Sequence, residues 1–340
     1  MKKIIYIAAI FSFLLTATSC SEDAFTQVVT FDIPKEPAKL VVTSDYLNSS
    51  DSMQVFISSS WNIGGELPKD SLKKCKVELL EGTKKIADIP YILSQNIASG
   101  GFNTGQSNSR TYQAYYMAKI PTKLADNQSY TLRVSAVGFE TVEAKSTMPK
   151  TVAIKKVIFT KNGFKGGSSG PFGNGGGSTI DLIAVEFDDA IEENFYNMEV
   201  IKMVRDTQTN ELYKGTSYFS LNQKFSADPF GEDDYSRSFN FTDEIFNGKT
   251  FVFKIGIDTE DTFIYSGNTG NSKGSSIVES YEVRLHSLSR ERFIFDNSLS
   301  KQQDSQGNPF AEPIPLYTNF DKGFGLFSLL NVSRYFVKIK

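Results

Sequence analysis

The chain has 340 residues, with 36 Lys and Arg against 39 Asp and Glu, and a formal net charge of -3. This charge argues against a nucleic-acid binder, which needs an excess of basic residues. One His and two Cys exclude most zinc sites, haem ligation through several histidines and a disulfide scaffold. The 28 Phe and 15 Tyr favour strands, and the length suggests about two domains.

The N-terminus has the layout of a secretory signal. Lys2 and Lys3 precede an apolar stretch at residues 4–15, and small or polar residues then lead to Cys20. The apolar stretch is too short to remain as a membrane-spanning helix, which needs about 20 residues. We therefore expect residues 1–19 to be a signal peptide that is removed from the mature protein.

Cys20 resembles the cysteine of the bacterial lipobox, whose thiol receives a diacylglyceryl group before the chain is cut ahead of it. Ala17 replaces the usual Leu, as in the looser lipoboxes of Bacteroidota. The alternative is an ordinary signal with a chance Cys. Residues 21–23 (SED) resemble the acidic signal of surface lipoproteins. We expect 20–26 to be a lipidated tether in outer-membrane lipid that faces the exterior, with the periplasmic side as the alternative.

Residues 27–151 show short β-rich runs separated by turn residues, a pattern typical of an immunoglobulin-like sandwich. The Cys…Trp…Cys spacing of true immunoglobulins is missing, so the prediction concerns architecture alone. The expected strands cover 39–44, 53–61, 76–80, 84–89, 113–120, 129–136 and 139–147.

Three side chains of this first domain are candidates for modification or chemistry. Ser52 and Ser71 follow an Asp and precede an aliphatic residue in predicted polar turns, and they resemble O-glycosylation sites of exported Bacteroidota proteins. Cys75 lies in an alternating strand pattern at 73–77, which indicates a small buried hydrophobe. A catalytic thiol would need His286, the one histidine, as its partner.

Residues 152–340 predict a second, mainly antiparallel β domain with one short helix near the C-terminus. The whole chain is therefore expected to be all-β. A strand at 154–159 leads into a Gly-rich loop at 163–178, and apolar residues at helical spacing predict a helix over 288–303. Further strands are expected at 179–187, 195–204, 213–221, 236–241, 250–257, 277–285, 314–318, 325–330 and 334–339.

The sequence holds short matches to catalytic and metal-binding motifs. The G-x-S-x-G match at 166–170 lacks the strand and helix that flank a nucleophile elbow, and the S-x-x-K matches at 71–74 and 298–301 come without K-T-G. Acidic loops at 228–234 and 258–261 could offer oxygens to calcium, but the EF-hand spacing is absent. We expect His286 to be structural, and no catalytic residue, metal or cofactor.

Four stretches together resemble one family. They are 128–149 (QSYTLRVSAVGFETVEAKSTMP), 183–196 (IAVEFDDAIEENFY), 239–248 (FNFTDEIFNG) and 308–327 (NPFAEPIPLYTNFDKGFGLF). This pattern is similar to that of the Bacteroidota lipoproteins catalogued as domain of unknown function 4249 (DUF4249).

The resemblance implies a location and a partner but no reaction. Members are typically exported lipoproteins that are often encoded beside TonB-dependent outer-membrane transporters. It implies a non-enzymatic accessory or binding component of nutrient uptake with such a transporter as partner. The alternatives are an adhesin or structural surface protein without a transport partner, and a hydrolase of an unrecognised type.

The last stretch also has a physical interpretation. Pro309 and Pro313 fix φ and remove backbone donors, which favours an extended segment, and Glu312 lies between them. Residues 321–323 predict a tight turn between two strands. Gly323 and Gly325 permit positive φ or a close backbone approach. The motif either closes the second sheet or forms the lip of a binding site.

Overall fold

The computed structural model describes residues 37–60, 71–92, 114–165, 179–207, 209–217, 219–221, 238–257, 276–305 and 312–339. The chain divides into two compact units, Met1–Pro37 and Ala38–Lys340, and every described strand lies in the second unit. Strands dominate this unit, and one α-helix lies near the C-terminal end of the described residues, which confirms the all-β fold class. No helix within these ranges has the length and apolar character needed to cross a membrane.

The first part of the chain forms short strands whose side chains are buried at every second position, as a half-buried sheet requires. A short 3₁₀ helix, η2, covers Ser71–Lys74. The strands are β1 (Leu40–Leu47), β2 (Ser52–Ser59), β3 (Lys76–Glu81), β4 (Lys84–Asp88), β5 (Ala114–Lys119), β6 (Ser129–Ser135) and β7 (Val142–Thr147).

The second part contains longer strands and the helix α2 (Arg290–Ser305), close to its predicted range. The strands are β8 (Ile154–Lys165), β9 (Thr179–Asp188), β10 (Phe195–Asp206), β11 (Leu212–Thr216), β12 (Phe219–Leu221), β13 (Ser238–Thr242), β14 (Thr250–Ile257), β15 (Ser276–Leu288) and β16 (Phe324–Lys338).

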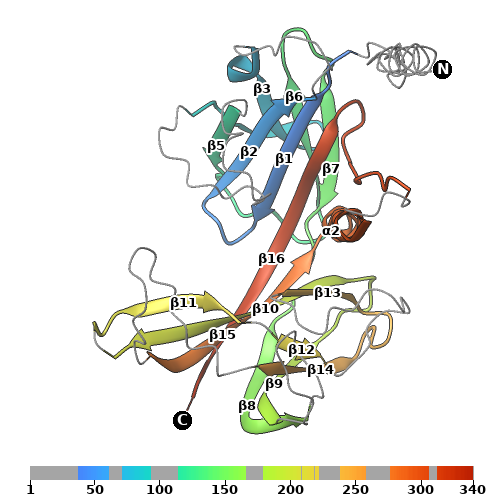
Figure 1. Ribbon diagram of the computed structural model, residues 1–340. Helices are drawn as coiled ribbons and strands as arrows, with labels where there is room; N and C mark the ends of the chain where they lie inside the picture. The colour runs from blue at the N-terminus through green and yellow to red at the C-terminus, as the bar shows by residue number, and fades with distance from the viewer. Residues whose placement is uncertain are drawn as a thin grey trace, which may run out of the picture. The chain divides into compact units, whose positions relative to one another are not determined.

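The described strands form three sheets (Figure 1). The largest has the order β11-β10-β15-β16-β1-β2-β5, with β13 also paired to β10. A second has the order β4-β3-β6-β7, and a third β12-β14-β9-β8. Neighbours are antiparallel throughout, except for the parallel pair β1 and β16.

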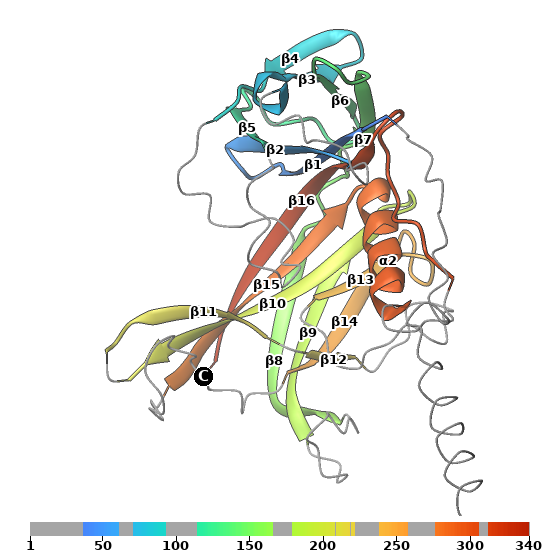
Figure 2. The same ribbon diagram turned by 45° about the horizontal axis from the view of Figure 1, so that its top comes forward.

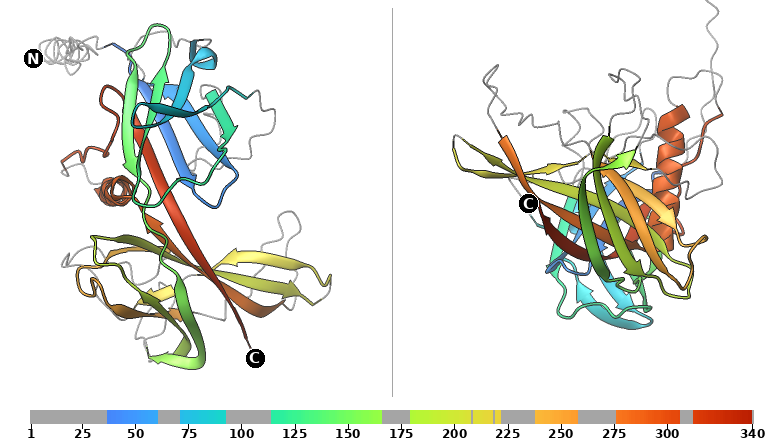
Figure 3. Two further views of the ribbon diagram at one scale, coloured as in Figure 1. Left: turned by 180° about the vertical axis from the view of Figure 1, so that it is seen from behind. Right: turned by 90° about the horizontal axis from the view of Figure 1, so that it is seen from below.

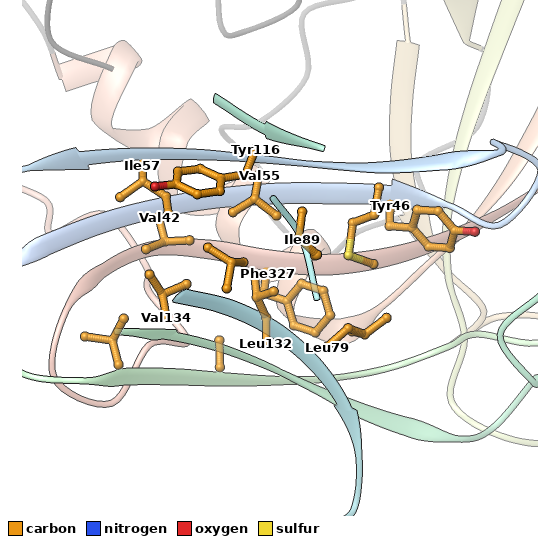
Figure 4. Close-up of a cluster of buried hydrophobic side chains, with 14 of the residues drawn as sticks. Val42, Tyr46, Val55, Ile57, Leu79, Ile89, Tyr116, Leu132, Val134 and Phe327 are labelled. Carbon is orange, nitrogen blue, oxygen red and sulfur yellow. The ribbon is translucent and has the colours of Figure 1, made fainter. Parts of the chain in front are cut away.

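A first hydrophobic core lies between β1, β2, β5 and β16 of the large sheet and the sheet of β3, β6 and β7. Figure 4 shows side chains from both sheets meeting there, among them Val42, Val55, Leu79, Leu132 and Phe327, each fully buried. Such a sandwich buries one face of each sheet and leaves the other face for polar residues.

A second core lies between β10, β13 and β15 of the same large sheet and the sheet of β8, β9 and β14. Figure 3 shows these two sheets from behind and from below. Aromatic rings fill this second core. Phe241 and Phe253 have ring centroids 4.8 Å apart, and Phe246 and Phe251 stack at 4.1 Å. Aromatic pairs add about 0.5–1.5 kcal/mol beyond their buried area.

Strand β16 belongs to both cores (Figure 1). Its first half pairs with β1, from Phe324 opposite Val41 to Leu330 opposite Leu47. Its second half pairs with β15, from Leu330 to Lys338. Phe327 and Leu329 therefore enter the first core, although they lie far beyond the boundary at residue 151 that the sequence predicted.

Two glycines allow β16 to approach β1. Gly325 has a φ of +112°, and a Cβ there would lie 1.9 Å from the carbonyl oxygen of Val42. A Cβ on Gly323 would lie 2.7 Å from the carbonyl oxygen of Leu40. Any side chain would collide with backbone atoms that cannot move without breaking the sheet. Both residues are thus required by the contact with β1.

The predicted strand at 314–318 is wrong, and so is the hairpin across residues 321–323. Residues 312–319 form no strand, and only Phe320 makes an isolated bridge, to Ala144 of β7. Asn319 explains this result. Its side chain accepts from the Phe327 N–H at 3.0 Å and donates to the Phe327 carbonyl at 2.8 Å, so it occupies the groups that a hairpin partner would use.

Two smaller predictions also need correction. Residues 73–74 lie in η2 and not in a strand, because β3 begins only at Lys76. Residues 163–165 continue β8 and do not open the Gly-rich loop. Asn162 takes a φ of +52°, and the register with β9 shifts between Thr160 and Phe164. The strand then resumes with Phe164 buried. The remainder of that loop lies outside the described residues.

We predict that Gly325→Ala lowers the free energy of unfolding by about 3 kcal/mol or more, because it adds both backbone strain and overpacking. Gly138→Ala is the matched control, since Gly138 has a φ of +84° with no atom within 4 Å of the added Cβ. The control should lose only the strain term, about 1–2 kcal/mol. Chemical denaturation of both variants measures the difference, and equal losses would contradict the role of the Val42 contact.

Candidate functional site

Two of the sequence stretches that carry the family resemblance meet at neighbouring turns. Asp189 accepts from the Tyr196 hydroxyl at 2.5 Å and from the Gly248 N–H at 2.8 Å. Asp243 accepts from the backbone N–H of Asn194 at 2.9 Å and from its side chain at 3.1 Å. Burial raises the pKa of the Asp189 carboxyl, although the hydrogen bonds from Tyr196 and Gly248 oppose the shift. These carboxylates hold turns together and leave little room for a ligand.

Helix α2 lies on the face of the large sheet opposite the second core, alongside the ends of β10 and β13 (Figure 2). Arg292 fixes it there. Its guanidinium pairs with Asp45 of β1 and, at 3.0 Å, with Asp296 one turn further along the helix. Burial alone would lower the pKa of Arg292, but the two carboxylates outweigh burial and raise it.

Hydrogen bonds extend this network to three more strands. Asn240 of β13 donates to Asp296 at 3.2 Å, and Asn197 of β10 donates to Asn240 at 2.6 Å. Ser328 of β16 donates to Asp45. One partly buried cation therefore ties α2 to strands of both cores, which sets the position of the helix surface that faces solvent.

His286, the one histidine, lies in β15 on the same face of the large sheet. Its Nε2 is 3.7 Å from Glu199, and Arg284 lies 3.3 Å from the same carboxylate. His286 first and Arg284 second lower the pKa of Glu199. Arg284 also donates to the buried Glu282 at 2.8 Å. His286 lies in a row of polar and charged side chains along the strands.

Cys75 packs against the first core, and its thiol donates to the Leu72 carbonyl at 3.3 Å. Burial raises the pKa of this thiol, which disfavours the reactive thiolate. His286 faces Glu199, so the structure does not bring the thiol and the imidazole together. Among the described residues, no group of three His, Cys, Asp or Glu is placed to hold a metal ion.

A groove of about 420 Å³ lies between α2 and the ends of β10 and β13. Apolar side chains line its interior, and two of them, Phe195 and Phe293, are in contact with ring centroids 4.9 Å apart. The others are Ile294 on α2 and Ile314 in the segment that follows the helix. Pockets of roughly 300–1,000 Å³ with an apolar lining and a few polar groups are typical small-ligand sites.

Four charged side chains line the groove as well. Glu193 and Glu244 lie on the strand side, where β10 begins and β13 ends, and Arg290 and Lys301 lie on the helix. All four are exposed. None of them forms a salt bridge with another residue in the described ranges. The groove therefore presents negative charge on one side and positive charge on the other, both available to a ligand.

Ser298 and Lys301 of the second S-x-x-K match both line the groove, but they do not form a nucleophile with its base. The Ser298 hydroxyl donates to the Phe295 carbonyl at 2.8 Å and accepts from the Tyr317 N–H at 3.0 Å. Its proton and one lone pair are thus used to hold the helix against the segment at 314–317. The other uncharged polar side chains that line the groove are those of Thr242 and Asn297.

The other predicted site residues lie apart from the groove. Ser52 is half-buried at the start of β2, and Ser71 is the first residue of η2. Glu312 and Pro313 are exposed in the extended segment before β16. Cys20, Pro309, the G-x-S-x-G match and both acidic loops lie outside the described residues, so what the sequence indicates for them stays a prediction.

Sequence reasoning missed the groove, although one signal for it exists. Residues 290, 293, 294, 297, 298 and 301 recur at i, i+3, i+4, i+7, i+8 and i+11, which places them on one helix face. The predicted core stripe, which includes Phe295, accounts for a different face of the same helix. The sequence shows a second face of this helix, which carries the cations Arg290 and Lys301. It does not show which strands lie opposite that face.

We predict that Arg292→Ala lowers the free energy of unfolding by about 1.5–3 kcal/mol, because it removes a partly buried cation that pairs with two carboxylates. Arg290→Ala removes an exposed, unpaired charge two residues away and should change stability by less than about 0.5 kcal/mol. Urea denaturation of the two variants tests the prediction. Similar losses in both would show that the network adds nothing beyond helix propensity.

No curated protein matches this sequence. Among solved structures, the chain is similar to a Corynebacterium diphtheriae protein described as membrane anchored, with 9% sequence identity and a TM-score of 0.19. The likeness covers 74% of this chain and 54% of that one, so the chain spans about half of its length. A likeness this weak supports no conclusion about function.

The comparison with models of protein families, by contrast, identifies the family of this chain. The model of the domain of unknown function DUF4249 matches residues 26–335, which include every strand and the helix described above except the last residues of β16. All four stretches that carried the resemblance lie within this range. The chain belongs to the DUF4249 family.

Proposed function

We propose that the mature protein is a non-enzymatic lipoprotein of the outer membrane that faces the cell exterior and binds a ligand for uptake by a TonB-dependent transporter. The observation that carries the binding role is the groove beside α2, lined by apolar side chains and by four charges that form no salt bridge with another described residue. The anchor rests on Cys20 and the residues around it, and the transporter rests on the gene neighbourhood typical of the family.

The number of acyl chains determines how firmly such an anchor would hold the protein at the membrane. A single acyl chain gives an association constant of about 10⁴ M⁻¹, which is only marginal membrane binding. A bacterial lipoprotein carries two or three chains on its N-terminal cysteine, so the body would stay at the bilayer. The acidic residues Glu22 and Asp23 support the outer leaflet.

The groove supports binding because it is built on rigid elements. Its helix is fixed by the Arg292 ion pairs, and its strand side is the start of β10 and the end of β13, which pair with each other. The segment at 314–317 is held by hydrogen bonds from Tyr317 N–H to Ser298 and from the Gln302 side chain to the Ile314 carbonyl. A pre-formed site loses less entropy when a ligand binds.

We predict that Cys20→Ala abolishes labelling of the protein by radioactive fatty acid and releases it from the membrane fraction. Ser19→Ala is the control, since it changes a neighbouring residue and leaves the thiol in place. Labelled Cys20→Ala protein would refute lipidation at this residue. Protease treatment of intact cells then decides the leaflet, because only a surface protein is cleaved.

We predict that the native lipoprotein, solubilised in mild detergent, co-purifies with a TonB-dependent transporter in near-equal amounts. Quantitative mass spectrometry of the purified material measures the ratio. The Cys20→Ala variant serves as the control for association that depends on the membrane anchor. Recovery of the wild-type lipoprotein alone would contradict the transport role and favour the adhesin or structural surface protein.

A further inference from the structure

We infer that the groove beside α2 binds a short free peptide that keeps both its terminal ammonium group and its terminal carboxylate. The inference rests on the proposed binding function and specifies its ligand class. Three features of the groove carry it: the arrangement of its charges, the composition of its interior, and its size.

The charges favour a ligand that carries both signs. Glu193 and Glu244 lie on the strand side, while Arg290 and Lys301 lie on the helix, and the four charges sum to zero. A ligand of one sign gains at one side of the groove what it loses at the other. A zwitterion gains at both sides, with its ammonium group toward the carboxylates and its carboxylate toward the helix.

The interior favours apolar side chains over a sugar. Phe195, Phe293, Ile294 and Ile314 offer hydrocarbon surface to a ligand. A neutral oligosaccharide has a hydroxyl on most carbons and loses affinity when those groups are buried without partners. Among its uncharged polar side chains the groove offers Thr242 and Asn297, because the Ser298 hydroxyl is already used within the protein. Its charged side chains match the charged ends of a zwitterion better than neutral hydroxyls. A peptide with apolar side chains matches this composition better.

The size favours a short peptide. About 420 Å³ lies toward the lower end of the range of small-ligand pockets. Arg290 and Lys301 are separated by three turns of α2, which rises 1.5 Å per residue, so the two cations span roughly 16 Å along the groove. A peptide of a few residues can place its carboxylate near one of them and its ammonium group near the opposite side.

The experiment measures binding of the tetrapeptide Gly-Leu-Phe-Gly to the full lipoprotein in detergent by isothermal titration calorimetry, with detergent alone as the blank. The same peptide with an acetylated N-terminus loses its positive charge, and the amidated form loses its negative charge. Maltotetraose is the neutral sugar probe. All four probes have similar length, so the comparison isolates charge and chemistry.

Two double variants remove one side of the groove each, Glu193→Gln with Glu244→Gln and Arg290→Gln with Lys301→Gln. Glu140→Gln with Lys322→Gln is the matched control, because both side chains are exposed and neither lines the groove. The unfolding midpoint of each variant confirms that it folds.

We expect the free peptide to bind the wild-type and control proteins. Acetylation and the Glu193/Glu244 double variant should each weaken binding about tenfold, as two exposed ion pairs allow, and together they should weaken it no further. Amidation and the Arg290/Lys301 double variant should behave in the same way. These matched losses would assign each end of the peptide to one side of the groove.

Three results would overturn the inference: no heat of binding with the free peptide at millimolar concentration, equal binding of the free and blocked peptides, or tighter binding of maltotetraose. If the transporter still co-purifies in those cases, the proposed function survives and only the ligand class is wrong. Peptide binding by a lipoprotein that purifies without a transporter would support the inference and remove the transport role.

Discussion

The parallel pairing of β1 with β16 is the contact that positions every other part of the described structure. It brings the C-terminal end of the chain into the first core, where Phe327 and Leu329 complete the packing. The same strand continues into the second core along β15. The contact is possible because Gly323 and Gly325 leave space for the carbonyl oxygens of Leu40 and Val42. Strand β16 therefore joins the two hydrophobic cores, and glycine at positions 323 and 325 is what lets it do so.

Helix α2 depends on this junction. It follows β15 directly, and its Arg292 pairs with Asp45 on β1, a strand that the β1–β16 pairing places beside it. The partly buried cation between two carboxylates gives these contacts a defined geometry, so it specifies one position for the helix. The groove exists because that position leaves one face of α2 beside the ends of β10 and β13.

The residues that carry the family resemblance and the residues of the groove have different tasks. Asp189, Asp243 and Asn319 use their side chains to satisfy backbone groups at turns, and Gly325 allows the close strand contact. These are requirements of the fold. The charges of the groove satisfy nothing within the described residues, so the fold does not require them. Such charges are the expected property of a surface that serves a ligand.

Local patterns along the chain were enough to predict the all-β fold class, most strands and the helix, because alternation and helical spacing indicate which side chains face a core. The signal peptide and the lipidation of Cys20 stay predictions that rest on local sequence alone. Local patterns failed at residues 314–318, where a β-rich stretch has no free strand edge to join, since Asn319 occupies the backbone of Phe327. The membership of β16 in both cores, and the meeting of α2 with β10 and β13 at a groove, became visible only in the folded chain. Glu193 and Lys301 are more than a hundred residues apart, and no periodic pattern relates them. Local spacing encodes which face is buried, whereas the partner across that face depends on how the whole chain packs.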